Sequence, residues 1–101
     1  MEPGNKLIIS SLPKEWRDKD SIMLHACFQL LKDFVEKEDV GHMQDDWEYS
    51  ERHVAVKTEI DALYMWWESY SKKDHILIDE EYELQNSMLN RLIKIRWALS
   101  T

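Results

Sequence analysis

The sequence contains little that interrupts a helix or cross-links a chain. Its 101 residues include only two glycines, two prolines and one cysteine. Three of the four Gly and Pro residues precede residue 14, and Gly41 is the only one beyond it, so the interior lacks the turn residues that a β-rich domain requires. A single cysteine cannot form a disulfide within one chain, which favours a reducing compartment. These absences predict a helical protein of the cytoplasm.

Long apolar runs and catalytic motifs are also absent. The apolar run at residues 7–9 is too short for a signal peptide or a membrane span. There is no glycine-rich phosphate loop, no paired-cysteine zinc spacing, and neither a HExxH nor a GxSxG string. The four histidines are scattered along the chain, so their spacing defines no metal or general-base site. We therefore predict no enzyme activity, no catalytic residue, no cofactor, no metal and no membrane association.

The stretch 22–35 predicts a helix with a wide apolar face. At 100° per residue, its apolar residues after Ile22 fill an arc of about 200°; they are Met23, Leu24, Ala26, Cys27, Phe28, Leu30, Leu31, Phe34 and Val35. A surface helix needs an apolar face of only about 100° to dock on one neighbour. We therefore expect this helix to be covered from two sides, with Leu30 and Phe34 in the core, Cys27 as a packed thiol and Gln29 on the polar side.

Two further segments carry apolar stripes at helical spacing. The first, residues 50–70, starts at Ser50 as an N-cap candidate and has a stripe formed by Val56, Ile60, Leu63, Trp67 and Tyr70. The second, residues 79–99, begins with several acids in its first turn, where the helix dipole favours anions, and has a stripe formed by Leu84, Met88, Leu92, Ile95 and Leu99.

These segments predict a single all-α domain over residues 1–101, folded as an antiparallel three-helix bundle. Residues 1–18 are an N-terminal arm with a short extended segment, 19–38 the first helix, 39–49 an acidic loop, and 50–70 and 79–99 the other helices. Residues 75–78 could extend the third helix backwards or form a strand beside residues 7–9, and their period does not separate the two.

Charge is the most informative feature. The net charge is -7, and residues 33–51 contain eight acids against the single base Lys37. An acidic chain lacks the basic footprint that phosphate binding needs, so we expect no direct contact with nucleic acid. The candidate partner-binding surface is acidic and contains one tryptophan; it is formed by Asp45, Asp46, Trp47, Glu48 and Glu51. Their order lacks the alternation and fixed glycine of a calcium loop. The alternative is a solvated loop that only aids solubility.

Five tryptophans are a second signal. Trp67 faces the predicted core, whereas Trp47 falls in the middle of the acidic run. An exposed tryptophan among charges is typical of a binding hot spot, but a small bundle also uses tryptophan to seal its ends. Both interpretations of Trp47 stay open.

The blocks LHACFQLLKDFVEKE, ALYMWWESY and RLIKIRWALST resemble a set of small bacteriophage-encoded proteins of uncharacterised function. The resemblance implies a shared helical fold and a phage origin, and it brings no catalytic residues. Small acidic phage proteins often bind host machinery. The first hypothesis is therefore an inhibitor or modulator that binds a host or defence protein with a basic surface in place of nucleic acid, as an anti-defence or anti-CRISPR protein would. The alternative is a structural or assembly protein that forms a homo-oligomer.

Overall fold

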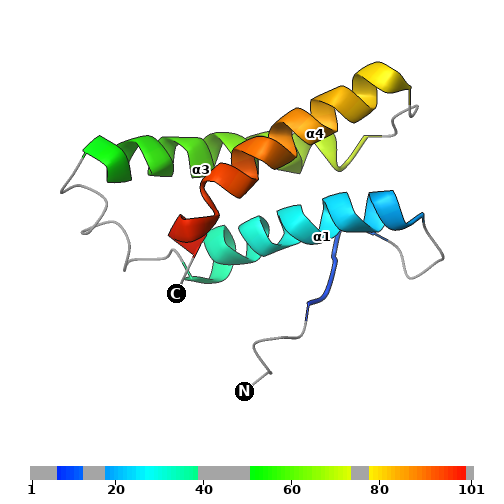
Figure 1. Cartoon of the computed structure of the whole chain (residues 1–101). Helices are drawn as coiled ribbons and strands as arrows, with labels where there is room; N and C mark the ends of the chain where they lie inside the picture. The colour runs from blue at the N-terminus through cyan, green and yellow to red at the C-terminus, as the bar shows by residue number, and fades with distance from the viewer. Residues whose placement is uncertain (1–6, 13–17, 39–50, 74–77, 100–101) are drawn as a thin grey trace.

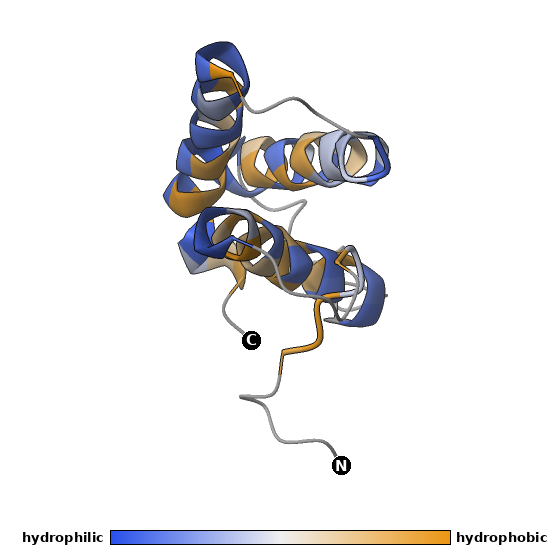
Figure 2. Ribbon diagram, turned by 90° about the vertical axis from the view of Figure 1, so that its right-hand side faces the viewer, coloured by the Kyte–Doolittle hydropathy of each residue, from blue (hydrophilic) through white to orange (hydrophobic). Residues whose placement is uncertain are grey.

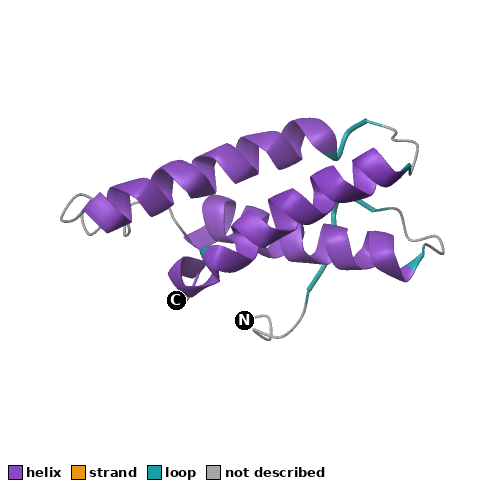
Figure 3. Ribbon diagram, turned by 45° about the horizontal axis from the view of Figure 1, so that its top comes forward, coloured by secondary structure: helices purple, strands orange, loops and turns teal. Residues whose placement is uncertain are grey.

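The computed structural model describes residues 7–12, 18–38, 51–73 and 78–99. Within them the chain forms three long helices, α1 (Lys19–Asp33), α3 (Glu51–Tyr70) and α4 (Asp79–Lys94) (Figure 1). A π-helical turn, η1 (Phe34–Glu38), continues α1, and a 3-10 turn, η2 (Arg96–Leu99), follows α4. Figure 3 shows these helices and no strand in the described ranges. The predicted all-α three-helix bundle is thus confirmed.

Consecutive helices run in opposite directions, so α1 and α4 are parallel to each other in direction and α3 is antiparallel to both (Figure 1). Figure 2, a view from one end of the bundle, shows α4 crossing the other two helices obliquely. As a result η1, the start of α3 and η2 lie at the same end of the molecule. Glu51 at the start of α3 and the basic residues late in α4 therefore lie toward the same end of the bundle.

The core lies between the three helices and takes one apolar stripe from each. On α3 the whole predicted stripe is buried, and it consists of Val56, Ile60, Leu63, Trp67 and Tyr70. Spacings of three and four residues place these side chains on one face, toward α1 and α4. Burying each large apolar side chain stabilises the fold by about 1.5–3 kcal/mol. The α3 stripe is thus the centre of the core.

On α1 the prediction of burial from two sides is wrong in part. Leu24, Phe28 and Leu31 are buried, and so is Phe34 in the following turn. Leu30, however, is 54% exposed, because the two neighbouring helices cover only one side of α1. A helix in a three-helix bundle has a solvent side, and an arc of about 200° exceeds what two neighbours cover.

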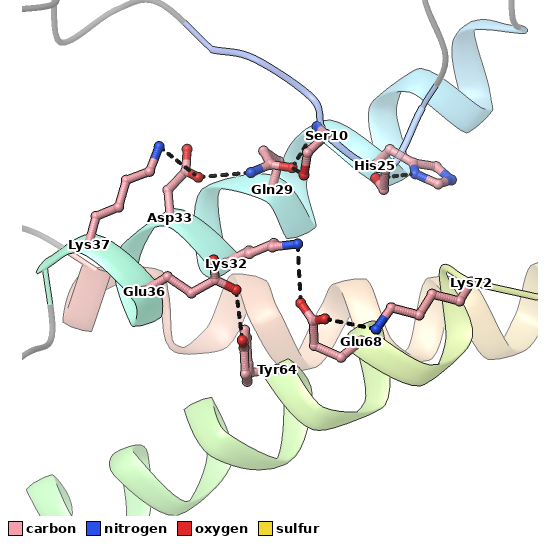
Figure 4. A network of polar contacts seen from close by, with 11 residues as sticks. Ser10, His25, Gln29, Lys32, Asp33, Glu36, Lys37, Tyr64, Glu68 and Lys72 are labelled. Carbon is pink, nitrogen blue, oxygen red and sulfur yellow. Dashed lines mark hydrogen bonds and ion pairs between the residues drawn. The ribbon is translucent and has the colours of Figure 1, made fainter.

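Gln29 is the second correction on α1, because it is only 4% exposed although the sequence places it on the polar side. Its Oε1 accepts hydrogen bonds from the backbone N–H of Ser10 at 3.0 Å and from the Ser10 hydroxyl at 2.9 Å. Its Nε2 donates to Asp33 Oδ1 at 2.8 Å (Figure 4). Residues 7–12 thus cover this side of α1, and the buried amide is satisfied as burial requires.

The third helix also differs from the prediction of 79–99, because α4 ends at Lys94 and η2 begins at Arg96. Met88, Leu92 and Ile95 of the predicted stripe are buried, whereas Leu84 is exposed. In the tighter turn after Ile95 the buried residue is Ala98. No glycine or proline marks this break in the sequence. Of residues 75–78, only Ile78 is described; its backbone is extended and precedes α4.

Aromatic rings fill the interface between α1 and α3. The Trp67 ring stacks on Phe28, with centroids 4.8 Å apart, and the His25 ring meets Trp67 edge-on at 4.8 Å. On the same helix, Trp66 stacks on Tyr70 at 4.5 Å. Such ring pairs contribute about 0.5–1.5 kcal/mol each beyond the area they bury. The predicted core position of Trp67 is confirmed.

Each pair of neighbouring helices is also joined by a tyrosine that donates a hydrogen bond to a carboxylate. These bonds join Tyr82 of α4 to Asp20 of α1, Tyr64 of α3 to Glu36 of η1, and Tyr70 of α3 to Glu81 of α4. The Tyr70 bond is partly buried, whereas the bonds of Tyr64 and Tyr82 are exposed and contribute less, because water competes for them.

Candidate partner-binding surface

The predicted acidic surface falls partly outside the described chain. Asp45, Asp46, Trp47 and Glu48 lie outside the described residues. Glu51 is described, as the first residue of α3, and it is exposed. An anion in the first turn of a helix interacts favourably with the helix dipole. The one described member of the predicted set therefore faces solvent at the start of α3.

Residues next to Glu51 meet the other end of the chain. The guanidinium carbon of Arg52 lies 4.0 Å from the centroid of the Trp97 ring, in a cation–π contact. The His53 ring centroid lies 6.5 Å from that of Trp97. Trp97 itself is 42% exposed, so this end of the bundle presents an indole beside a cation. An exposed contact of this kind is worth about 0.5–1 kcal/mol.

The sequence did not predict that Arg52 and Trp97 meet, because 45 positions separate them and neither belongs to an apolar stripe. The antiparallel topology brings them together by placing the end of α4 at the start of α3. At this end, the acidic residue Glu51 is followed directly by the basic residue Arg52, which makes a cation–π contact with Trp97. The surface that a partner would meet is therefore mixed in charge at its α3 edge.

The π-helical turn η1, which precedes residues 39–50 in the sequence, contains Glu36 and Lys37 (Figure 4). Glu36 Oε2 accepts a hydrogen bond from the Tyr64 hydroxyl at 2.7 Å. This bond, with a smaller contribution from burial, raises the pKa of Tyr64 to about 12, because the carboxylate stabilises the protonated phenol. The Lys37 ammonium lies 3.5 Å from Asp33 Oδ1. Glu36 of η1 and Asp33 at the end of α1 thus each contact another side chain of the same chain.

Away from this end, ion pairs engage some of the acids. Glu68 Oε1 lies 3.4 Å from the Lys32 ammonium. Arg91 Nε donates to Glu59 Oε2 at 2.9 Å, and this bond lowers the pKa of Glu59. The charge of Arg91 is therefore partly neutralised. Residues 39–50 by contrast contain four acids and no lysine or arginine.

The described residues offer little for covalent or metal chemistry. Cys27 is half-buried, and burial raises the pKa of its thiol, which keeps it protonated at neutral pH. In the described ranges, no group of three or more His, Cys, Asp or Glu side chains could hold a metal ion. None of the helices in this part of the chain is long and apolar enough to span a bilayer.

No protein-family model matches the chain, and no curated protein or solved structure matches it either. The resemblance to small bacteriophage proteins therefore stays a prediction.

Proposed function

We propose that the protein acts by binding another protein, and that its contact surface is the acidic segment Asp45, Asp46, Trp47 and Glu48 together with Glu51. The observation that supports this proposal is the distribution of charge. Residues 39–50 contain four acids and no lysine or arginine, while several acids of the described helices are paired with other side chains of the same chain. A partner with a basic surface would be attracted to this segment, because complementary charge steers encounter.

The class of partner follows from the same charge and from the resemblance. A basic groove that normally takes nucleic acid is complementary to a run of carboxylates, so a host or defence protein with such a groove is the proposed target. The protein would then inhibit or modulate that target in the cytoplasm of the host cell. This proposal gives Trp47 the role of an apolar anchor among the charges, as is typical of interface hot spots.

The test uses the tagged full-length chain to capture a partner from a bacterial lysate, followed by binding kinetics with purified variants. The acidic variant combines Asp45→Asn, Asp46→Asn and Glu48→Gln. The matched control neutralises three acids at the opposite end of the bundle and combines Asp79→Asn, Glu80→Gln and Glu83→Gln. We expect the acidic variant alone to associate more slowly and with a flatter salt dependence. Unchanged association in that variant would refute the proposal.

A second variant, Trp47→Ala, separates an anchor from a structural tryptophan. If Trp47 contacts the partner, its removal raises the dissociation rate and leaves the melting temperature unchanged, since affinity differences within one interface arise mostly in dissociation. If Trp47 only covers the end of the bundle, the melting temperature falls and the kinetics stay the same.

A further inference from the structure

The solvent side of α1 carries a strip that no described element covers. Its five residues are spaced by four, three, four and three positions, and they are Lys19, Met23, Ala26, Leu30 and Asp33. At 100° per residue they lie within an arc of about 80°. Met23 is 64% and Leu30 54% exposed, whereas their neighbours Leu24 and Leu31 are buried. Met23 lies one turn before Ala26 and Leu30 one turn after it, and together they form an apolar surface that a partner helix could cover.

The strip is complementary to a second copy of itself that runs in the opposite direction. A base begins it, an acid ends it, and large apolar residues flank the central alanine. When two copies lie antiparallel with Ala26 opposite Ala26, Met23 of each faces Leu30 of the other. Lys19 of each copy then faces Asp33 of the other. A parallel arrangement would instead place each charge beside its own kind, which is unfavourable.

The carboxylate of Asp33 is already positioned by contacts within its own chain, because the Lys37 ammonium lies 3.5 Å from its Oδ1. Its Oδ1 accepts a hydrogen bond from Gln29 Nε2 at 2.8 Å, and that amide is buried and fixed by Ser10. The carboxylate at the end of the strip is therefore kept in one position. The small side chain of Ala26 at the centre permits close approach of two helix backbones, as small residues do at helix crossings.

We infer that the protein forms a two-fold symmetric dimer in which α1 of one copy packs antiparallel against α1 of a second copy, centred on Ala26. A two-fold interface is self-complementary by necessity, and this strip has that property. Its length from Lys19 to Asp33 is about 21 Å at 1.5 Å per residue. One helix pair of this length buries less than the roughly 800 Å² per partner that stable complexes bury. The dimer is therefore weak and dependent on concentration.

Sedimentation of the full-length chain between about 10 µM and about 1 mM, the range in which weak complexes form, tests self-association directly. We expect the mean mass to rise toward that of a dimer across this range. Leu30→Glu and Met23→Glu should each keep the protein monomeric. The matched control is Met65→Glu, which replaces a side chain that is 70% exposed on α3, and it should dimerise like the wild type. A wild type that stays monomeric throughout would overturn the inference.

Two further variants test the geometry of the pair. In a Cys27→Ala background, Ala26→Cys should form a disulfide dimer on mild oxidation, whereas Met65→Cys in the same background should not. Lys19→Glu should weaken the dimer, and combining it with Asp33→Lys should restore it, because both charges are then reversed. Helical circular dichroism verifies that each variant is folded. If the Ala26→Cys variant dimerises in sedimentation but does not cross-link on oxidation, or if the double charge reversal does not restore the dimer, this arrangement is excluded.

These tests are independent of the proposed function. The strip on α1 shares no residue with the acidic segment, so a monomeric protein could still bind a basic partner. Conversely, loss of partner binding in the acidic variant would leave the dimer intact.

Discussion

Two neighbouring leucines on α1 have opposite surroundings. Leu31 is fully buried among α3 and α4 side chains, whereas the side chain of Leu30 lies more than half in solvent. Their hydropathy is identical, and the wide apolar arc in the sequence does not separate them. The difference shows that an apolar residue on a bundle helix can lie either in the core or in solvent, and that the position of the neighbouring helices decides which.

The largest expected effect is the contrast between Leu31→Asp and Leu30→Asp. An unpaired charge at Leu31 would be buried in the core, so we expect that variant to be unfolded. Leu30→Asp places its charge in solvent and should retain cooperative melting and helical circular dichroism. Equal loss of structure in both variants would mean that the outer face of α1 is part of the core.

Gln29 lies between the core-facing side and the solvent side of α1. Truncating its side chain should have the next largest effect on stability. Gln29→Ala leaves the Ser10 N–H without its acceptor and should lower the free energy of unfolding by about 1–3 kcal/mol. Asn90→Ala, on the exposed face of α4, is the control and should change stability by less than about 0.5 kcal/mol. Urea denaturation measures both. If the two variants prove equally stable, residues 7–12 contribute nothing to covering α1.

A smaller effect is expected at Cys27, which packs against the core from a half-buried position. Cys27→Ala should cost on the order of 1 kcal/mol, because it removes one heavy atom from a site that is only partly closed. Thermal melting measures this cost. A loss of partner binding without a loss of stability would instead assign the thiol a role in recognition.

The smallest effect concerns pH and the exposed contact between Tyr64 and Glu36. The pKa of Tyr64 is raised from its ordinary value of 10 to about 12 in the folded protein. Its contribution to stability is therefore complete below pH 10 and is lost as the pH rises toward 12. Tyr64→Phe should show a shallower decline of melting temperature over this range. Tyr70, whose pKa is raised chiefly by burial, and Tyr82, whose pKa is raised by Asp20, should contribute to the decline that remains.

The positions of the helices could be read from the sequence because long amphipathic periods are strong signals. The predicted range 19–38 spans α1 and η1, and the predicted start at residue 79 is where α4 begins. The stripe on α3 was predicted residue by residue. This success follows from chemistry that is local: spacing determines which residues share a face, and acids in the first turn mark where α4 starts.

The features that the sequence did not reveal depend on contacts between distant segments. The burial of Gln29 requires Ser10, and the contact of Arg52 with Trp97 requires the chain to return to the start of α3. The sequence contains no helix-breaking residue that would predict the end of α4 at Lys94. Of the predicted binding surface, only Glu51 is placed by the structure, and the assignment of the other four residues stays a prediction.

The stacked rings between α1 and α3 also give the protein a built-in optical probe. Trp66 and Trp67 have centroids 6.0 Å apart and are held against Phe28 and Tyr70 in fixed orientations. Aromatic rings in a rigid, asymmetric environment produce near-ultraviolet circular dichroism, which disappears when packing loosens even if the helices persist. Near- and far-ultraviolet spectra of the unlabelled chain will therefore distinguish a loosened bundle from an unfolded one.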